Sequence, residues 1–367
     1  EFGLYASLDA GRTWTDWGAG FPTVPVRSLV VHPRDADLVV GTHGRAAWVI
    51  DDIRPLRALA ADGAVAEAPL TLFDPPPAYQ HTRQTIGPFY FPGDARFHGD
   101  NRAYGALLTF HVSEAGVAQA EADGDGDARA TFVVRDAAGD SLRAFTAPVR
   151  AGLNRAEWNL RRDGYRSLVP DDTPEAFRPQ GPEVPPGRYT VEVTLGDHRA
   201  RTAVEVRPDP RRSIAHAERV AKWDAMERAG ARLEQVTDAV RRLESTRETL
   251  SLVQKRVRDD GSETLAERGD SLLARMDGLL TALRQPPGEV GWVDDRSATT
   301  LLGQSVAELQ SSYDAPTEAQ ATRLDRRDRA AADTLADVDA FYANELPSFR
   351  RAVEAEGLDP WGGGGDE

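Results

Sequence analysis

The amino-acid sequence predicts a multidomain protein with short β-strands up to Arg207 and long α-helices after Pro210. Two observations support this order. In the first part, short apolar runs are separated by Gly, Pro, Asn and Asp, which is typical of strands joined by tight turns. In the second part, apolar residues recur every three or four positions, the spacing of one helix face. A chain of 367 residues is long enough for two or three domains with separate cores.

The composition argues against several classes of protein. A formal net charge of −15 disfavours binding to nucleic acid or to an anionic membrane surface. The chain has no cysteine, which excludes disulfides, thiol catalysis and cysteine-based zinc sites. The seven histidines are scattered, and no phosphate-binding loop, dinucleotide fingerprint or nucleophile elbow is present. No apolar run is long enough for a transmembrane helix.

The most specific motif is the segment S-x-D-x-G-x-T-W at residues 7–14. We expect Ser7 and Asp9 to accept hydrogen bonds from backbone amides within a tight turn. Gly11 supplies backbone freedom where the chain reverses. Thr13 favours the outgoing strand, and Trp14 is expected to bury its ring under the hairpin.

This motif resembles the Asp box, or BNR signature, found at hairpins of β-propeller blades in sialidases, xyloglucanases and sortilin-like receptors. Residues 1–60 resemble the last blades of bacterial sortilin-like BNR-repeat proteins, which are often labelled glycosyl hydrolases. The segments 31–34 and 40–45 contribute to this resemblance. It implies a large propeller upstream, an extracellular or periplasmic location and, by label, carbohydrate chemistry. The Asp box itself marks a fold and carries no catalysis.

Residues 1–77 are predicted to form the terminal propeller blades, and residues 78–104 a linker. An isolated blade cannot bury both faces of its sheet, so we expect the chain to be the C-terminal part of a longer protein. Residues 26–31 are expected to be a buried inner strand, and residues 70–73 the last strand of the second blade. The expected strands of this region are 3–8, 13–17, 26–31, 38–42, 46–50 and 70–73.

Residues 105–208 are predicted to form an immunoglobulin-like β-sandwich, because several short strands alternate with turn signals. Leu108, Phe110 and Val112 share one face of a strand by alternation. Trp158 is expected in the core. The expected strands are 106–113, 130–136, 141–145, 154–160, 188–195 and 201–207.

Residues 211–360 are predicted to form an antiparallel α-helical bundle, because short connections join four segments of helical periodicity. An alternative use of the same heptads is an intermolecular coiled coil. The tail at 361–367, with four consecutive glycines, is predicted to be disordered.

Four residues are candidates for ligand binding. His43 and Arg45 lie in a Gly-containing turn, a position that either faces a propeller channel or holds the turn through backbone hydrogen bonds. Trp17 and Tyr90 belong to aromatic clusters that either stack on sugar rings or pack a linker against a sheet.

Two groups of carboxylates are candidates for chemistry. Asp51 and Asp52 are adjacent and point to opposite faces of a strand, so by themselves they do not form a glycosidase pair. Capping of a strand end is the alternative. Asp123, Asp125 and Asp127 alternate like the start of a calcium loop, but Ala128 and Val134 exclude an EF-hand. These three residues are then interpreted either as a looser calcium site or as an acidic hairpin exposed to solvent.

These features give three functional hypotheses. The first is a non-catalytic C-terminal accessory region of an exported propeller protein, binding carbohydrate or protein. The second is a fragment of a glycoside hydrolase whose catalytic acids lie in upstream blades. The third is a helical bundle that binds a partner. No catalytic residue is assigned, and calcium is the one cofactor considered.

Overall fold

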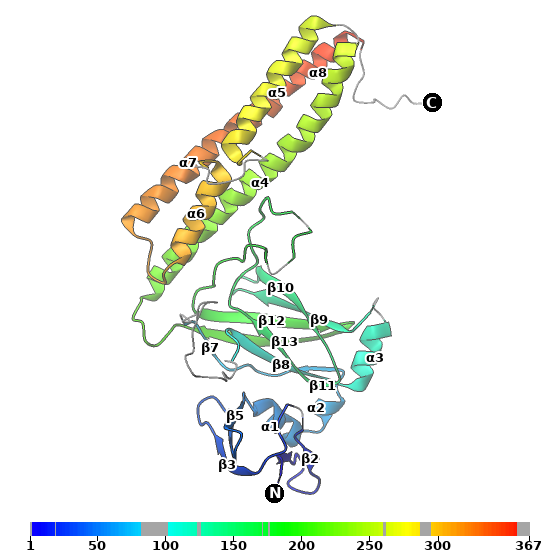
Figure 1. The fold of residues 1–367 in the computed structure, drawn as a ribbon, viewed down its shortest axis with the longest axis vertical. Coiled ribbons are helices and arrows are strands. Elements are labelled where there is room, and N and C mark those ends of the chain that lie inside the picture. The colour runs from blue at the N-terminus through cyan, green and yellow to red at the C-terminus, as the bar shows by residue number, and fades with distance from the viewer. Residues whose placement is uncertain are drawn as a thin grey trace. The chain divides into compact units, whose positions relative to one another are not determined.

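A computed structural model describes residues 2–18, 20–81, 102–122, 126–170, 172–174, 177–259, 262–286 and 295–357. The chain divides into two compact units, one formed by Glu1–Asp163 with Glu183–Ser213, the other by Gly164–Pro182 with Ile214–Glu367. The first unit contains all strands of the described residues, and the second is built from helices (Figure 1). The prediction of a multidomain chain with sheets followed by helices is therefore confirmed.

The first unit begins with a hairpin and a small sheet. Strands β1 and β2 pair antiparallel, and β3, β4 and β5 form an antiparallel sheet in that order. Two short helices follow, which the sequence analysis did not predict. The bounds are β1 Tyr5–Ala6, β2 Thr15–Asp16, β3 Val26–Val31, β4 Leu38–Thr42, β5 Ala47–Ile50, α1 Arg54–Ala61 and α2 Ala64–Glu67.

Two expectations for this region are wrong. Strand β3 is not buried: Val26 is half-buried and the next five residues are exposed. The strand is apolar as expected, but no element among the described residues buries its side chains. Residues Leu70–Leu72 form strand β6, which pairs with β8 of a different sheet. A short apolar run indicates a strand without indicating its partner, because pairing depends on tertiary contacts.

The rest of the first unit contains two sheets. One has the order β10-β9-β12-β13-β7, with β7 parallel to β13 and the other pairs antiparallel; the other has the order β11-β8-β6 and is antiparallel. Strand β7 lies in the stretch predicted to be a linker. The bounds are β6 Leu70–Leu72, β7 Ala78–Tyr79, β8 Ala106–Val112, α3 Glu114–Ala122, β9 Arg129–Arg135, β10 Ser141–Pro148, β11 Gly152–Trp158, β12 Gly187–Leu195 and β13 His198–Arg207.

Aromatic contacts join these two sheets. The rings of Phe110 on β8 and Phe132 on β9 meet edge to face, with centroids 5.4 Å apart. Trp158 on β11 meets Tyr189 on β12 in the same manner at 5.3 Å. Trp158 is almost completely buried, so its prediction as a core residue is confirmed. Large rings in such pairs contribute more than their buried area alone.

The second unit contains long helices that pack on each other (Figure 1). Helix α4 spans 44 residues and packs against α5, α6 and α7. Its residues Val240, Leu243 and Val257 are fully buried in a core shared with α5 and α7. The bounds are α4 His216–Asp259, α5 Glu263–Leu283, α6 Ala298–Gln310, α7 Glu318–Ala340, η2 Phe341–Glu345 and α8 Leu346–Ala355.

The segment Gly164–Pro182 lies between β11 and β12 in the sequence but belongs to the helical unit. The Tyr165 hydroxyl donates to the Glu227 carboxylate of α4 at 2.8 Å. Arg166 pairs with Asp238, also on α4, at 2.8 Å. A Cβ added at Gly230 of α4 would overlap the Tyr165 ring. Strand periodicity gives no sign of this excursion, because it depends on single side-chain contacts.

No helix among the described residues combines the length and apolarity needed to cross a membrane.

Candidate functional site

The Ser7–Trp14 turn is held by side chains of the motif. The Asp9 carboxylate accepts the backbone N–H of Thr13 at 2.9 Å and the Thr13 hydroxyl at 2.7 Å. Ser7 Oγ accepts the Gly11 N–H at 2.7 Å. Gly11 has a φ of 88°, a conformation that favours glycine. The hydrogen bonds from the Thr13 backbone and hydroxyl, in that order, lower the pKa of Asp9 to about 2.

Trp14 does not bury its ring, contrary to the sequence expectation. The residue is 64% exposed, and its ring lies over the turn at Gly11. A two-stranded hairpin has no second layer to cover a large ring. The indole is thus an exposed apolar group of the hairpin.

Sheet β3–β5 carries exposed apolar residues of its own. Val30, Val39 and Val49 are direct cross-strand partners, so their side chains share one face of the sheet. Val30 and Val49 are each 58% exposed. We call Val30, Val39 and Val49 the valine row. Exposed β-branched residues in a continuous row indicate a surface that packs against another element.

The other face of the sheet borders an apolar cavity of about 240 Å³. The cavity lies between the β1–β2 hairpin, the sheet and helix α1. Trp17 and Leu29 are among its lining residues, with Ile50 and Leu56. Trp17, a candidate for sugar binding, therefore lines an apolar cavity.

His43 and Arg45 lie in the turn between β4 and β5, and both are exposed. The backbone holds this turn: the His43 N–H donates to the Pro25 carbonyl, and Trp48 Nε1 donates to the Arg45 carbonyl, each at 2.9 Å. The Trp48 ring meets Phe21 edge to face at 5.5 Å. These contacts correspond to the backbone-holding alternative, and they leave both candidate side chains in solvent.

The remaining candidates do not form a binding site among the described residues. Tyr90, Asp123 and Asp125 lie outside the described residues. Asp127 is exposed. Within the part of the chain that the structure describes, no group of three or more His, Asp or Glu side chains is arranged to hold a metal ion.

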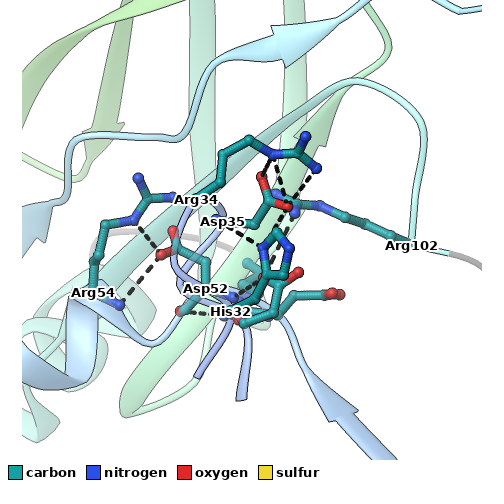
Figure 2. A network of polar contacts seen from close by, with 9 residues as sticks. His32, Arg34, Asp35, Asp52, Arg54 and Arg102 are labelled. Carbon is teal, nitrogen blue, oxygen red and sulfur yellow. Dashed lines mark hydrogen bonds and ion pairs between the residues drawn. The ribbon is translucent and has the colours of Figure 1, made fainter. Parts of the chain in front are cut away.

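A polar network lies at the end of strand β5 (Figure 2). Asp52 is buried in a left-handed backbone conformation, with φ of 47°. Its N–H donates to the Asp37 carboxylate at 2.9 Å, and Arg54 Nε donates to its carboxylate at 2.5 Å. The carboxylate of Asp52 is therefore engaged by a neighbouring cation, which corresponds to the strand-end alternative of the sequence analysis.

The same network contains further ion pairs. Asp35 accepts from Arg34 at 2.9 Å and lies 3.0 Å from His32 Nδ1, as Figure 2 shows. The hydrogen bond from Arg34 lowers the pKa of Asp35. Arg102 lies 3.8 Å from the Asp37 carboxylate. The first two pairs lie within the loop before β4, whereas the Arg102–Asp37 pair joins this loop to a residue distant in sequence.

Arg155 of β11 joins this network to the sheet β11-β8-β6. Its guanidinium donates to the backbone carbonyl of Asp51, and to that of Asp52 at 3.1 Å. Burial lowers its pKa, and the Asp51 and Asp52 carboxylates oppose the shift; an arginine nevertheless remains protonated. Sequence reasoning missed Arg155, because one arginine in an alternating strand carries no distinguishing signal.

The chain matches no protein-family model, no curated protein and no solved structure in the comparisons made.

Proposed function

We propose that this chain is a non-catalytic interaction region of a BNR-repeat β-propeller protein. In this proposal, the β1–β2 hairpin and sheet β3–β5 are terminal blades of the propeller. Further blades, preceding them in a longer exported protein, cover their apolar surfaces. The observation that carries the proposal is the exposure of the valine row on a sheet whose outer strands, β3 and β5, have no further strand partner among the described residues.

The chemistry of the valine row favours another β-sheet as the occupant. β-Branched side chains in register give a flat surface, and two sheets pack face to face about 10 Å apart through such surfaces. The Ser7–Trp14 turn supports the same assignment, because its motif residues hold a tight hairpin through side-chain hydrogen bonds. The exposed Trp14 ring is a second apolar element available to a neighbouring blade.

The two larger regions have supporting roles in this proposal. The sheets containing β8 and β9, with aromatic rings packed between them, would be an immunoglobulin-like sandwich that acts as a spacer. The helical unit, with its own buried core, would be an antiparallel bundle that mediates association. The buried, Arg54-bound carboxylate of Asp52 gives no support to the glycoside hydrolase alternative.

The proposal is tested by binding of this chain to the further propeller blades that it invokes, expressed separately. The double variant Val30→Thr/Val49→Thr keeps β-branched shape while adding hydroxyls to the valine row. Because burying one such side chain contributes ~1.5–3 kcal/mol, we expect the variant to bind at least about tenfold more weakly by titration calorimetry.

Leu252→Thr is the matched control, since Leu252 is an exposed apolar residue of helix α4. This control is expected to bind like the wild type. Equal affinity of the double variant and the wild type would contradict the proposal, as would the lack of any binding by the wild type.

A further inference from the structure

The second face of the sheet β11-β8-β6 carries two polar side chains of β8 that are nevertheless buried. Thr109 and His111 of β8 lie on this face, opposite to Phe110. Arg155 is the cross-strand partner of Thr109, and Leu153 and Thr71 are the partners of His111. These five side chains therefore share one surface.

Residues 51–67 cover this surface. Arg155 donates to the carbonyls of Asp51 and Asp52, and helix α2 packs against β8. The Thr71 hydroxyl donates to the Val65 carbonyl of α2 at 3.3 Å. The contact between residues 51–67 and the sheet is thus a joint between the small sheet β3–β5 and the larger β-region of the first unit.

His111 is the titratable group beside Thr71, the residue of β6 that donates to helix α2 in this joint. The residue is only 9% exposed, and its Nδ1 is buried without a hydrogen-bond partner among the described residues. Thr109 Oγ1 is in the same situation. No hydrogen bond from these two atoms therefore offsets the free-energy cost of a charge on His111. Burying a charged imidazolium costs far more than burying the neutral ring. Burial lowers the pKa of His111.

The charged groups around His111 do not compensate for its protonation. Strand β11 contributes Arg155, which has the same sign as an imidazolium, and Glu157, which is exposed. Helix α2 contributes Glu67 and helix α3 begins with Glu114; both are exposed. The covering segment also contributes Asp51, which is half-buried and acts on Arg155, and Asp52, whose buried carboxylate is paired with Arg54. Strand β6 contributes the neutral Thr71. Exposed carboxylates are screened by water and stabilise a buried cation weakly.

We propose that His111 makes this joint acid-sensitive, so that its protonation releases residues 51–67, and with them sheet β3–β5, from the sheet β11-β8-β6. The sign follows from linkage. Because the docked form holds His111 neutral, the released form takes up a proton first as the pH falls below the ordinary histidine value of 6.5. Docking is fully favoured above that pH and weakens as the pH falls towards the lowered pKa. This inference is independent of the proposed function.

Hydrogen exchange read by mass spectrometry tests the proposal on the full chain between pH 7.5 and 5. After correction for intrinsic rates, we expect the opening of residues 51–67 to increase as the pH falls. The increase is at most tenfold per pH unit, because one proton is taken up. Strands β12 and β13 are expected to show no such change. The variant His111→Leu, which is apolar like its neighbour Leu153, is expected to abolish the increase.

His198→Gln is the matched control, because His198 is a half-buried histidine whose ring contacts Gln119 at 3.0 Å; it is expected to behave like the wild type. A wild-type joint whose exchange does not depend on pH would overturn the proposal, as would an unchanged pH dependence in His111→Leu. Should that variant fail to fold, NMR titration of His111 in the wild type decides. A pKa at or above 6.5 would also overturn the proposal.

Discussion

Strands β3 and β8 have comparable sequences and opposite environments. Strand β3 contains four apolar residues in six, and β8 contains five in seven. No residue of β3 is buried, whereas all residues of β8 are buried. The difference lies in what packs on each strand: β8 has a sheet on one face and residues 51–67 on the other. Strand formation is therefore local, while burial is decided by neighbours supplied from elsewhere.

The comparison predicts unequal responses to truncation. Phe110→Ala in β8 removes a fully buried ring and is expected to reduce the free energy of unfolding of the first unit by about 3–5 kcal/mol. Val30→Ala in β3 removes exposed methyl groups and is expected to change it by at most about 0.5 kcal/mol. Urea unfolding followed by tryptophan fluorescence measures both values. Similar losses for the two variants would show that β3 is covered in solution.

A second pair of variants extends the comparison to the helices. Gly230→Ala in α4 places a methyl group against the Tyr165 ring, and overpacking of this kind costs about 1–3 kcal/mol. Gly278→Ala in α5 meets no atom within 4 Å. This second variant is expected to stabilise the helical unit by about 0.5–1 kcal/mol, as alanine does in an open helix position.

Thermal unfolding followed by circular dichroism separates the two glycine variants by the sign of the shift in Tm. Stabilisation by both variants would mean that Tyr165 is not packed on Gly230. That result would contradict the packing of the segment Gly164–Pro182 on the helical unit.

The sequence predicted most strands and helices, because alternation, turn residues and heptad spacing are local signals. The strand at 26–31 matches β3 residue for residue. The partner of Leu70–Leu72 was missed, because pairing is a tertiary property. Helices α1, α2 and α3 were also missed, since they are short and bury at most one residue each.

The candidate site was predicted less completely than the fold. The hydrogen bonds expected of Ser7 and Asp9 are present, because the motif specifies them within one turn. Burial of Trp14 was wrong, because it requires a layer outside the hairpin. Arg155 and His111 were not singled out, since their importance arises from residues 51–67 packing over them. Local hydrogen bonds can be inferred from sequence, whereas contacts between distant segments cannot.

The most direct test of the account is hydrogen exchange of the valine row strands in solution. In this chain alone, the amides of β3 are expected to exchange much faster than those of β8, and to slow when the further propeller blades of the proposed function are added. If the amides of β3 exchange as slowly as those of β8 in the isolated chain, the result would contradict the proposal that sheet β3–β5 is uncovered and packs against a further sheet.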